Sequence, residues 1–192
     1  MNIRLPLFLL IALAQISVPA YLIHREETTL TQGHLLKFKT APVDPVDALR
    51  GRYVSLSFDA ATVPHNLDGS LGDAAQKHPI PVYATFAEDT TTGYATLTAL
   101  SDQKPSSNNT ATLQVLFHPR YRDPRQIELP FNRFYMEEHA APNAEAAYRQ
   151  NTSKKQDTYA LVAIYHGHAA IKDLYIGGVP IRDYLQSHPE GK

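Results

Sequence analysis

An uncharged, apolar run at residues 5–23 constrains this chain more than any other feature of its sequence. As an α-helix the run rises about 1.5 Å per residue, or roughly 28 Å in all, which is close to the roughly 30 Å hydrocarbon thickness of a bilayer. Arg4 precedes the run, so the positive-inside rule predicts a cytoplasmic N-terminus and a translocated remainder. The sequence therefore predicts a transmembrane helix within residues 1–26 and a folded domain in residues 27–192.

A cleaved signal peptide is the alternative to a retained anchor. Residues 18–20, Val-Pro-Ala, form a weak small-residue cleavage site. Against cleavage, the apolar run is longer than the roughly 7–15 residues of a usual signal-peptide core. Gln15 and Pro19 are tolerable in a single span. We therefore expect the helix to be retained as an anchor.

Composition and motifs exclude several classes of function. The formal net charge of −1 gives no electrostatic basis for binding nucleic acid. The chain has no cysteine, which rules out disulfides, cysteine–zinc sites and thiol catalysis. It also lacks a Gly-x-Ser-x-Gly nucleophile motif and a glycine-rich phosphate loop. No motif indicates a cofactor.

The rest of the chain alternates apolar and polar residues in the manner of β-strands. In residues 53–58, for example, Val54, Leu56 and Phe58 lie on one face of a predicted strand. Further strands are predicted at residues 35–40, 80–87, 94–100, 110–118, 158–165 and 169–175, with one extended stretch at 125–135. Turn-forming residues such as Gly167 separate them.

One helix is predicted in the domain, at residues 141–150. Pro142 suits a first helical turn, and Glu145 and Arg149 have the spacing of a helix-face ion pair. Residues 151–155 then read as a solvated break, and residues 74–77 as a candidate short helix. These elements predict a β-rich fold, all-β or α+β, forming a small barrel or sandwich-like domain with one short helix.

Two short blocks of sequence stand out, one with Gly51, Tyr53 and Leu56 and one at residues 133–138. They resemble blocks of the GDYXXLXY family, a group of bacterial membrane-anchored proteins of unknown activity. Gly51, Tyr53 and Leu56 match the motif that gives the family its name, whereas Arg52 replaces its Asp and Phe58 its second Tyr. Residues 133–138, Arg-Phe-Tyr-Met-Glu-Glu, resemble a second family block, and residues 162–178 resemble its closing hairpin. Because Arg52 replaces an acid, chemistry that needs a carboxylate at this position is unavailable here.

The resemblance implies a location and a type of partner. It implies a single-pass protein of the bacterial inner membrane, anchored through residues 5–23, with a cytoplasmic N-terminus and a periplasmic domain. Family members look like companions of multi-spanning membrane proteins. We therefore expect a protein that acts through binding or assembly, without enzymatic activity and without nucleic acid.

Four residues are the candidate binding residues: Arg52, Tyr53, Tyr135 and Glu138. Alternation places Tyr53 on the face opposite Val54, so Arg52 and Tyr53 could contact a sugar or a carboxylate if that face lines a groove. The structural alternative is a glycine turn that starts a core strand, with Tyr53 anchoring it. Tyr135 and Glu138 are chosen because they belong to the second family-like block.

A periplasmic hydrolase or metal-dependent enzyme is the alternative function, in which Glu138 would act with His139, His166 or His168. Two histidines at i and i+2 in one strand share a face and could both bind a metal ion. Gly167 between them indicates a tight turn, however, which would separate the two rings. No catalytic residue and no metal ligand is assigned.

Overall fold

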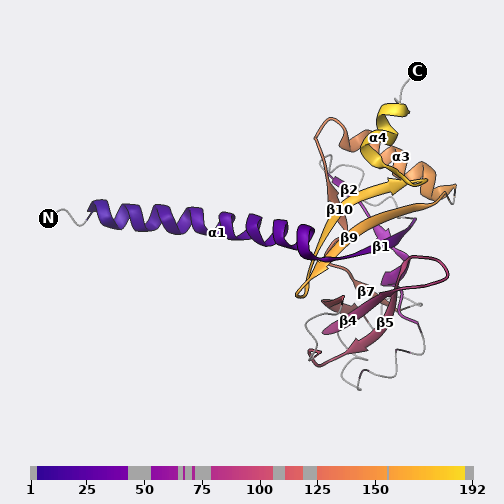
Figure 1. Ribbon diagram of the computed structural model, residues 1–192, viewed down its shortest axis with the longest axis horizontal. Helices are drawn as coiled ribbons and strands as arrows, with labels where there is room; N and C mark the ends of the chain where they lie inside the picture. The colour runs from indigo at the N-terminus through magenta and orange to yellow at the C-terminus, as the bar shows by residue number, and fades with distance from the viewer. Residues whose placement is uncertain are drawn as a thin grey trace.

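The computed structural model describes residues 4–42, 53–64, 67, 71, 79–105, 111–118, 125–154 and 156–188. A long N-terminal helix, α1 (Arg4–Gln32), extends away from a strand-rich domain (Figure 1). Within α1, Leu7–Gln32 is long and apolar enough to cross a membrane, and its most apolar window is not buried in the protein. The helix continues beyond the apolar run because no glycine follows until Gly33.

The end of α1 packs directly on the domain. Thr29 in its last turn is 1% exposed, and Gly33 donates its backbone N–H to the Thr29 carbonyl at 3.0 Å. A Cβ at Gly33 would lie 2.4 Å from that carbonyl oxygen and 3.0 Å from the Cβ of Ala163. Only glycine therefore allows this close approach, and the anchor is joined to the domain by packed helix rather than by a loose linker.

The larger sheet has five antiparallel strands in the order β11-β10-β9-β1-β3. They are β1 (His34–Ala41), β3 (Ser57–Phe58), β9 (Thr158–Tyr165), β10 (His168–Ile176) and β11 (Val179–Pro180). Tight turns at Gly167, with φ 82°, and at Gly177 and Gly178 connect the last three strands, as predicted. In β1, Leu36 and Phe38 face the core while the intervening Lys37 is exposed.

The second sheet has four antiparallel strands in the order β5-β4-β6-β7. They are β4 (Ile80–Glu88), β5 (Ala95–Ser101), β6 (Thr112–His118) and β7 (Gln126–Glu128). The strands predicted at 80–87, 94–100 and 110–118 are confirmed to within two residues. Leu113, Val115 and Phe117 share the buried face of β6, as the alternation predicts.

Two stretches predicted as single strands are divided between sheets. Residues 53–58 form β2 (Tyr53–Ser55), which pairs with β8 (Arg133–Tyr135), and β3, which pairs with β1. Leu56 between them donates its N–H to the Asn132 carbonyl at 2.9 Å. Residues 125–135 likewise divide into β7 and β8. The predicted burial of Val54, Leu56 and Phe58 is nevertheless confirmed.

Four phenylalanine rings join the sheets into a half-barrel around one core. The Phe38 ring centroid lies 5.9 Å from Phe58, 5.2 Å from Phe86 and 5.0 Å from Phe131, all edge to face. Such pairs are worth about 0.5–1.5 kcal/mol beyond their burial. The β-rich fold predicted from the sequence is thus confirmed.

Helix α3 (Ala141–Ser153) confirms the predicted helix and its ion pair, since Arg149 and Glu145 lie 2.8 Å apart. The predicted break at 151–155 is wrong in its first residues. Asn151 and Thr152 are helical and buried, because their side chains donate to carbonyls four residues earlier. Their polarity misled the prediction, because internal hydrogen bonds replace solvent.

A second domain helix, α4 (Ile181–Ser187), was not predicted. It is too short for a clear periodic pattern, and it forms because buried Ile181 and half-buried Tyr184 pack against the core. The short helix predicted at residues 74–77 lies outside the described residues.

Candidate functional site

Strands β2 and β8 bring the two family-like blocks together, although they are far apart in the sequence. The opposed residues are Tyr53 and Tyr135, Val54 and Phe134, and Ser55 and Arg133. Side chains alternate across a strand, so Val54 and Phe134 enter the core while the other four point outward. We call these four outward residues, Tyr53, Ser55, Arg133 and Tyr135, the motif ribbon.

The motif ribbon presents aromatic rings and a guanidinium group to the surroundings. The rings of Tyr53 and Tyr135 have centroids 5.7 Å apart, and the Arg133 guanidinium carbon lies 5.0 Å from the centre of the Tyr53 ring. Tyr135 is 64% exposed. Exposed cation–π contacts are worth about 0.5–1 kcal/mol, which orders these side chains but adds little to stability. Tyrosine and arginine are also enriched at protein interfaces.

The structure therefore brings two of the four predicted binding residues together, Tyr53 and Tyr135. Arg52 lies outside the described residues. Glu138 is exposed in the turn between β8 and α3, where the carbonyl of Glu137 accepts N–H groups from Ala140 and Ala141 at 3.0 and 2.9 Å. Arg133 was missed by the sequence reasoning, although alternation from Tyr135 indicates that it shares the same face.

The histidines of the enzyme hypothesis lie in two places. His139 is exposed in the same turn as Glu138. His166 and His168 flank the β9–β10 turn, which Figure 1 shows at the opposite end of the large sheet from α3 and α4. His166 adopts a left-handed backbone with φ 47°, and its ring contacts Tyr165. Within the described residues no three His, Cys, Asp or Glu side chains group as metal ligands would.

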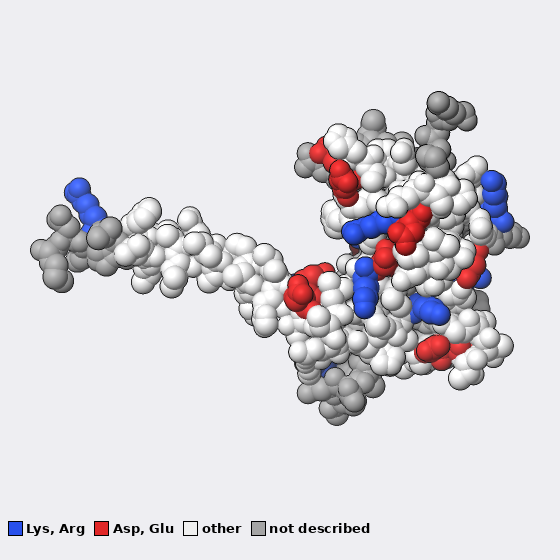
Figure 2. Space-filling view, turned by 45° about the horizontal axis from the view of Figure 1, so that its top comes forward, with Lys and Arg blue, Asp and Glu red and all other residues white. Residues whose placement is uncertain are grey.

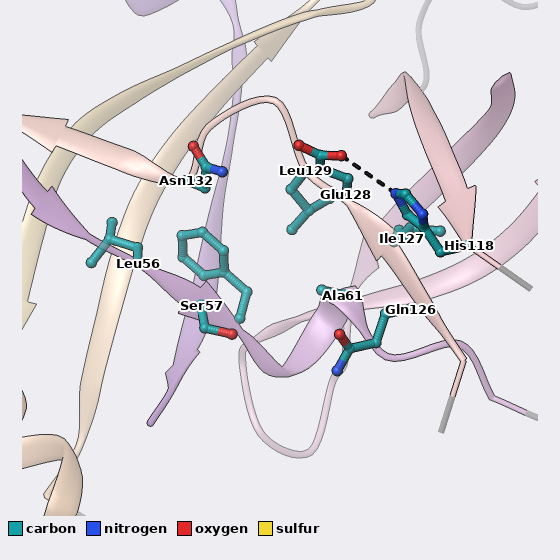
Figure 3. A pocket seen from close by; sticks show the side chains of 10 residues that line it. Leu56, Ser57, Ala61, His118, Gln126, Ile127, Glu128, Leu129 and Asn132 are labelled. Carbon is teal, nitrogen blue, oxygen red and sulfur yellow. Dashed lines mark hydrogen bonds and ion pairs between the residues drawn. The ribbon is translucent and has the colours of Figure 1, made fainter. Parts of the chain in front are cut away.

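A cavity of about 350 Å³ opens beside β6, between residues 56–58, which follow β2, and residues 126–132, which precede β8 (Figure 3). It is lined by Leu56, Ser57, Phe58, Ala61, His118, Gln126, Ile127, Glu128, Leu129 and Asn132. Nε2 of His118 lies 3.4 Å from an oxygen of Glu128, and these side chains are 32% and 59% exposed. Ion pairs this exposed contribute about 0–1 kcal/mol.

The cavity suits binding better than nucleophilic catalysis. Figure 3 shows Ser57 on the opposite side of the cavity from His118, with Ala61 and Gln126 between them. A serine nucleophile needs its base within hydrogen-bonding reach, which this arrangement does not provide. The amides of Gln126 and Asn132 can instead donate to or accept from a polar ligand. No local sequence pattern indicates this site, because it depends on the pairing of β6 with β7.

A second cavity, of about 390 Å³, adjoins a row of tyrosines that links the two large sheets. Tyr94 donates its hydroxyl to Asp157 at 2.5 Å, and its ring lies 5.9 Å from Tyr159, which stacks on Tyr175 at 4.9 Å. Burial, together with the bond to Asp157, raises the pKa of Tyr94, so its phenol stays protonated as the donor. Lys39 lies over the Tyr94 ring. These ring faces already contact one another or lysine. We therefore assign the row of tyrosines a structural role, which is to join the two large sheets.

Comparison with known proteins gives one match. The family described as GDYXXLXY protein matches residues 15–174, which include the C-terminal part of α1's apolar run, the motif ribbon and most of the β9–β10 hairpin. No curated protein and no solved structure matches the chain.

Proposed function

This chain belongs to the GDYXXLXY family, and from that premise we propose that it is a binding protein of the bacterial inner membrane. Its domain faces the periplasm and engages a multi-spanning membrane protein. It acts through contact, not catalysis. One candidate span near the N-terminus and a basic Arg4 before it support this topology.

The observation that carries the proposal is the motif ribbon. Two blocks from distant parts of the sequence are paired so that two tyrosines and an arginine reach the surface together, while their neighbours Val54 and Phe134 hold the ribbon in the core. A few such Tyr and Arg side chains supply most of the energy in many interfaces. Figure 2 shows basic and acidic side chains interspersed on the visible face of the domain, and this mixture favours a protein partner over an anionic polymer.

The enzyme alternative draws no support from geometry. Glu138 and His139 lie in the turn before α3, whereas His166 and His168 lie at the far end of the large sheet. Of these side chains only Glu138 and His139 share one region of the fold, so we favour binding over catalysis.

Site-specific photo-crosslinking in native membranes tests the proposal. A photoreactive residue at Tyr135 should form an adduct with a protein that resists alkaline extraction from the membrane. Gln114, exposed on β6, is the control position and should form none. Adding Tyr53→Ala and Arg133→Ala should reduce the Tyr135 adduct. Equal adducts from positions 135 and 114, or adducts only with soluble proteins, would refute the proposal.

A further inference from the structure

Gln15 places an amide near the middle of the apolar run of α1. The run covers residues 5–23, so Gln15 lies about one residue from its centre. Its side chain carries two N–H donors and a carbonyl acceptor. Among the described residues no hydrogen bond to this side chain is found, and Gln15 is exposed on the helix surface. In a bilayer this position has no water to serve the amide.

Pro19 removes a backbone hydrogen-bond donor from the same residue. Proline has no backbone N–H, so Pro19 within α1 cannot donate to the carbonyl four residues earlier, which is that of Gln15. The nearby hydroxyl of Ser17 does not replace this bond, because it donates to the carbonyl of Ala14 at 2.9 Å. Gln15 thus offers its surroundings a side-chain amide and a backbone carbonyl that lacks the usual donor four residues later.

These groups define one face of the helix. Ala12, Gln15 and Pro19 follow the i, i+3, i+7 spacing and therefore lie on the same side of α1. Ala12 is small, which allows another helix to approach closely, and polar groups in membranes commonly bond across such contacts. The apolar part of α1 stands clear of the domain, so nothing in the domain covers this face (Figures 1 and 2).

We propose that the Ala12–Gln15–Pro19 face packs against a transmembrane helix of the partner membrane protein, through a polar side chain that lies at mid-membrane depth. This inference rests on the proposed function and names the membrane contact that accompanies the motif ribbon. The partner helix must carry both a donor and an acceptor, or a hydroxyl, so that the Gln15 carbonyl and amide are both served.

The shape of the molecule argues for a partner helix rather than α1 of a second copy. Figures 1 and 2 show the domain extending to both sides of the line of α1. The packed junction at Thr29 and Gly33 fixes the domain at the end of the helix. Two parallel copies with α1 in contact, at about 8–10 Å between axes, would have to place two such domains side by side at that spacing. A multi-spanning protein with short periplasmic loops meets no such obstacle.

Photo-crosslinking within α1 of the full chain in native membranes tests the contact. The probe replaces Ala12, and the matched control replaces Leu10, which lies on the opposite side of the helix. We expect an adduct with a membrane protein from position 12 and little from position 10. Gln15→Leu should weaken the adduct by roughly 3- to 20-fold, the range for one bond between membrane helices. Gln15→Asn should restore much of it.

Each other outcome counts against the inference. Equal adducts from positions 12 and 10, no adduct, or an adduct that survives Gln15→Leu would overturn it. An adduct between two differently tagged copies of this chain would show that a second copy occupies the face instead. Gln15→Leu makes the run more apolar, so failed insertion would not explain a loss. The Tyr135 probe separates the two proposals, because an adduct there without one at Ala12 leaves the proposed function standing.

Discussion

Asn151 in α3 and Gln15 in α1 are amide side chains in opposite surroundings. In α3, Asn151 is 4% exposed and donates to the Ala147 carbonyl at 2.7 Å and to the Tyr184 hydroxyl at 3.1 Å. In α1, the side chain of Gln15 makes no hydrogen bond with the described residues and is exposed on the helix surface. The domain thus satisfies Asn151 internally, whereas the side chain of Gln15 has no partner among the described residues.

The same contrast holds in the core of the domain. Thr40 and Thr158, both buried, share a hydrogen bond between hydroxyls at 2.6 Å, and the Thr152 hydroxyl lies 3.3 Å from that of Thr158. Buried polar groups that are fully bonded specify one packing. From the difference we infer that the domain is stable without a partner, while the membrane helix is where the chain is incomplete.

Phe38→Ala tests the self-sufficiency of the domain and should have the largest effect. Phe38 is 0% exposed and contacts three other phenylalanines, so its loss should cost about 3–5 kcal/mol of unfolding free energy. The measurement is urea unfolding of the full chain in detergent micelles, followed by near-ultraviolet circular dichroism. Phe8→Ala in α1, where Phe8 is 66% exposed, is the control and should leave the transition unchanged. A shift with Phe8→Ala would show that the anchor supports the domain.

Replacing the two amides tests the comparison directly. Asn151→Leu should lower the unfolding free energy by about 1–3 kcal/mol, because the Tyr184 hydroxyl loses a partner in a half-buried site. Gln15→Leu should leave the same unfolding transition unchanged, because no described residue depends on it. The contrast fails if both substitutions shift the transition equally.

Gly33→Ala tests the boundary between the two regions. The added Cβ would press on the Thr29 carbonyl and on Ala163, so we expect a cost of about 1–2 kcal/mol, within the range for overpacking. Hydrogen exchange should quicken at backbone amides 29–35 and stay unchanged in β4 and β6. Gln32→Ala, an exposed neighbour, should have neither effect. Unaltered exchange in Gly33→Ala would mean that the helix is not fixed to the sheet.

Much of this fold follows from local sequence patterns. Three local preferences persist in the folded protein: the helix of the apolar run, the alternation of buried Leu36 with exposed Lys37, and the place of Pro142 in the first turn of α3. The division of residues 53–58 between two sheets could not be predicted, because it depends on the position of Asn132, far along the chain. The polar residues just after residue 150 were wrongly predicted to be solvated. In a sequence, polar residues that are buried with internal hydrogen bonds cannot be distinguished from polar residues exposed to solvent.

The candidate site was predictable only in part, for the same reason. Tyr53 and Tyr135 were selected from their blocks, but the pairing of β2 with β8 brought them into contact. Which strands pair is a property of the whole chain, and no local pattern encodes it. The cavity at His118 and Glu128 depends on the pairing of β6 with β7, so no local pattern in the sequence indicates it.

Asp59 and Asp89 test whether the domain satisfies all of its polar groups. Substitutions at these two residues should have the smallest effects on stability. Both line the cavity beside the tyrosine row. Burial raises the pKa of Asp59, and the charge of Lys39 offsets this only in part. A backbone N–H of Thr91, which donates to the Asp89 carboxylate at 2.8 Å, lowers the pKa of Asp89. The charged form of Asp59 is therefore poorly stabilised by its surroundings, whereas the charged form of Asp89 is stabilised by hydrogen bonds.

The two shifts predict opposite pH dependences of stability. A raised carboxyl pKa means that the folded state binds more protons than the unfolded state, so the contribution of Asp59 falls as pH rises through its folded pKa. Asp59→Asn should therefore be more stable than the parent chain at neutral pH, and the difference should vanish in acid. The contribution of Asp89 is present at neutral pH and is lost as pH falls through its lowered pKa, so Asp89→Ala should be less stable at neutral pH. Urea unfolding at pH 7 and at decreasing pH measures both. If Asp59→Asn is destabilised at pH 7, its carboxylate has a stabilising partner, and the domain satisfies its polar groups even there.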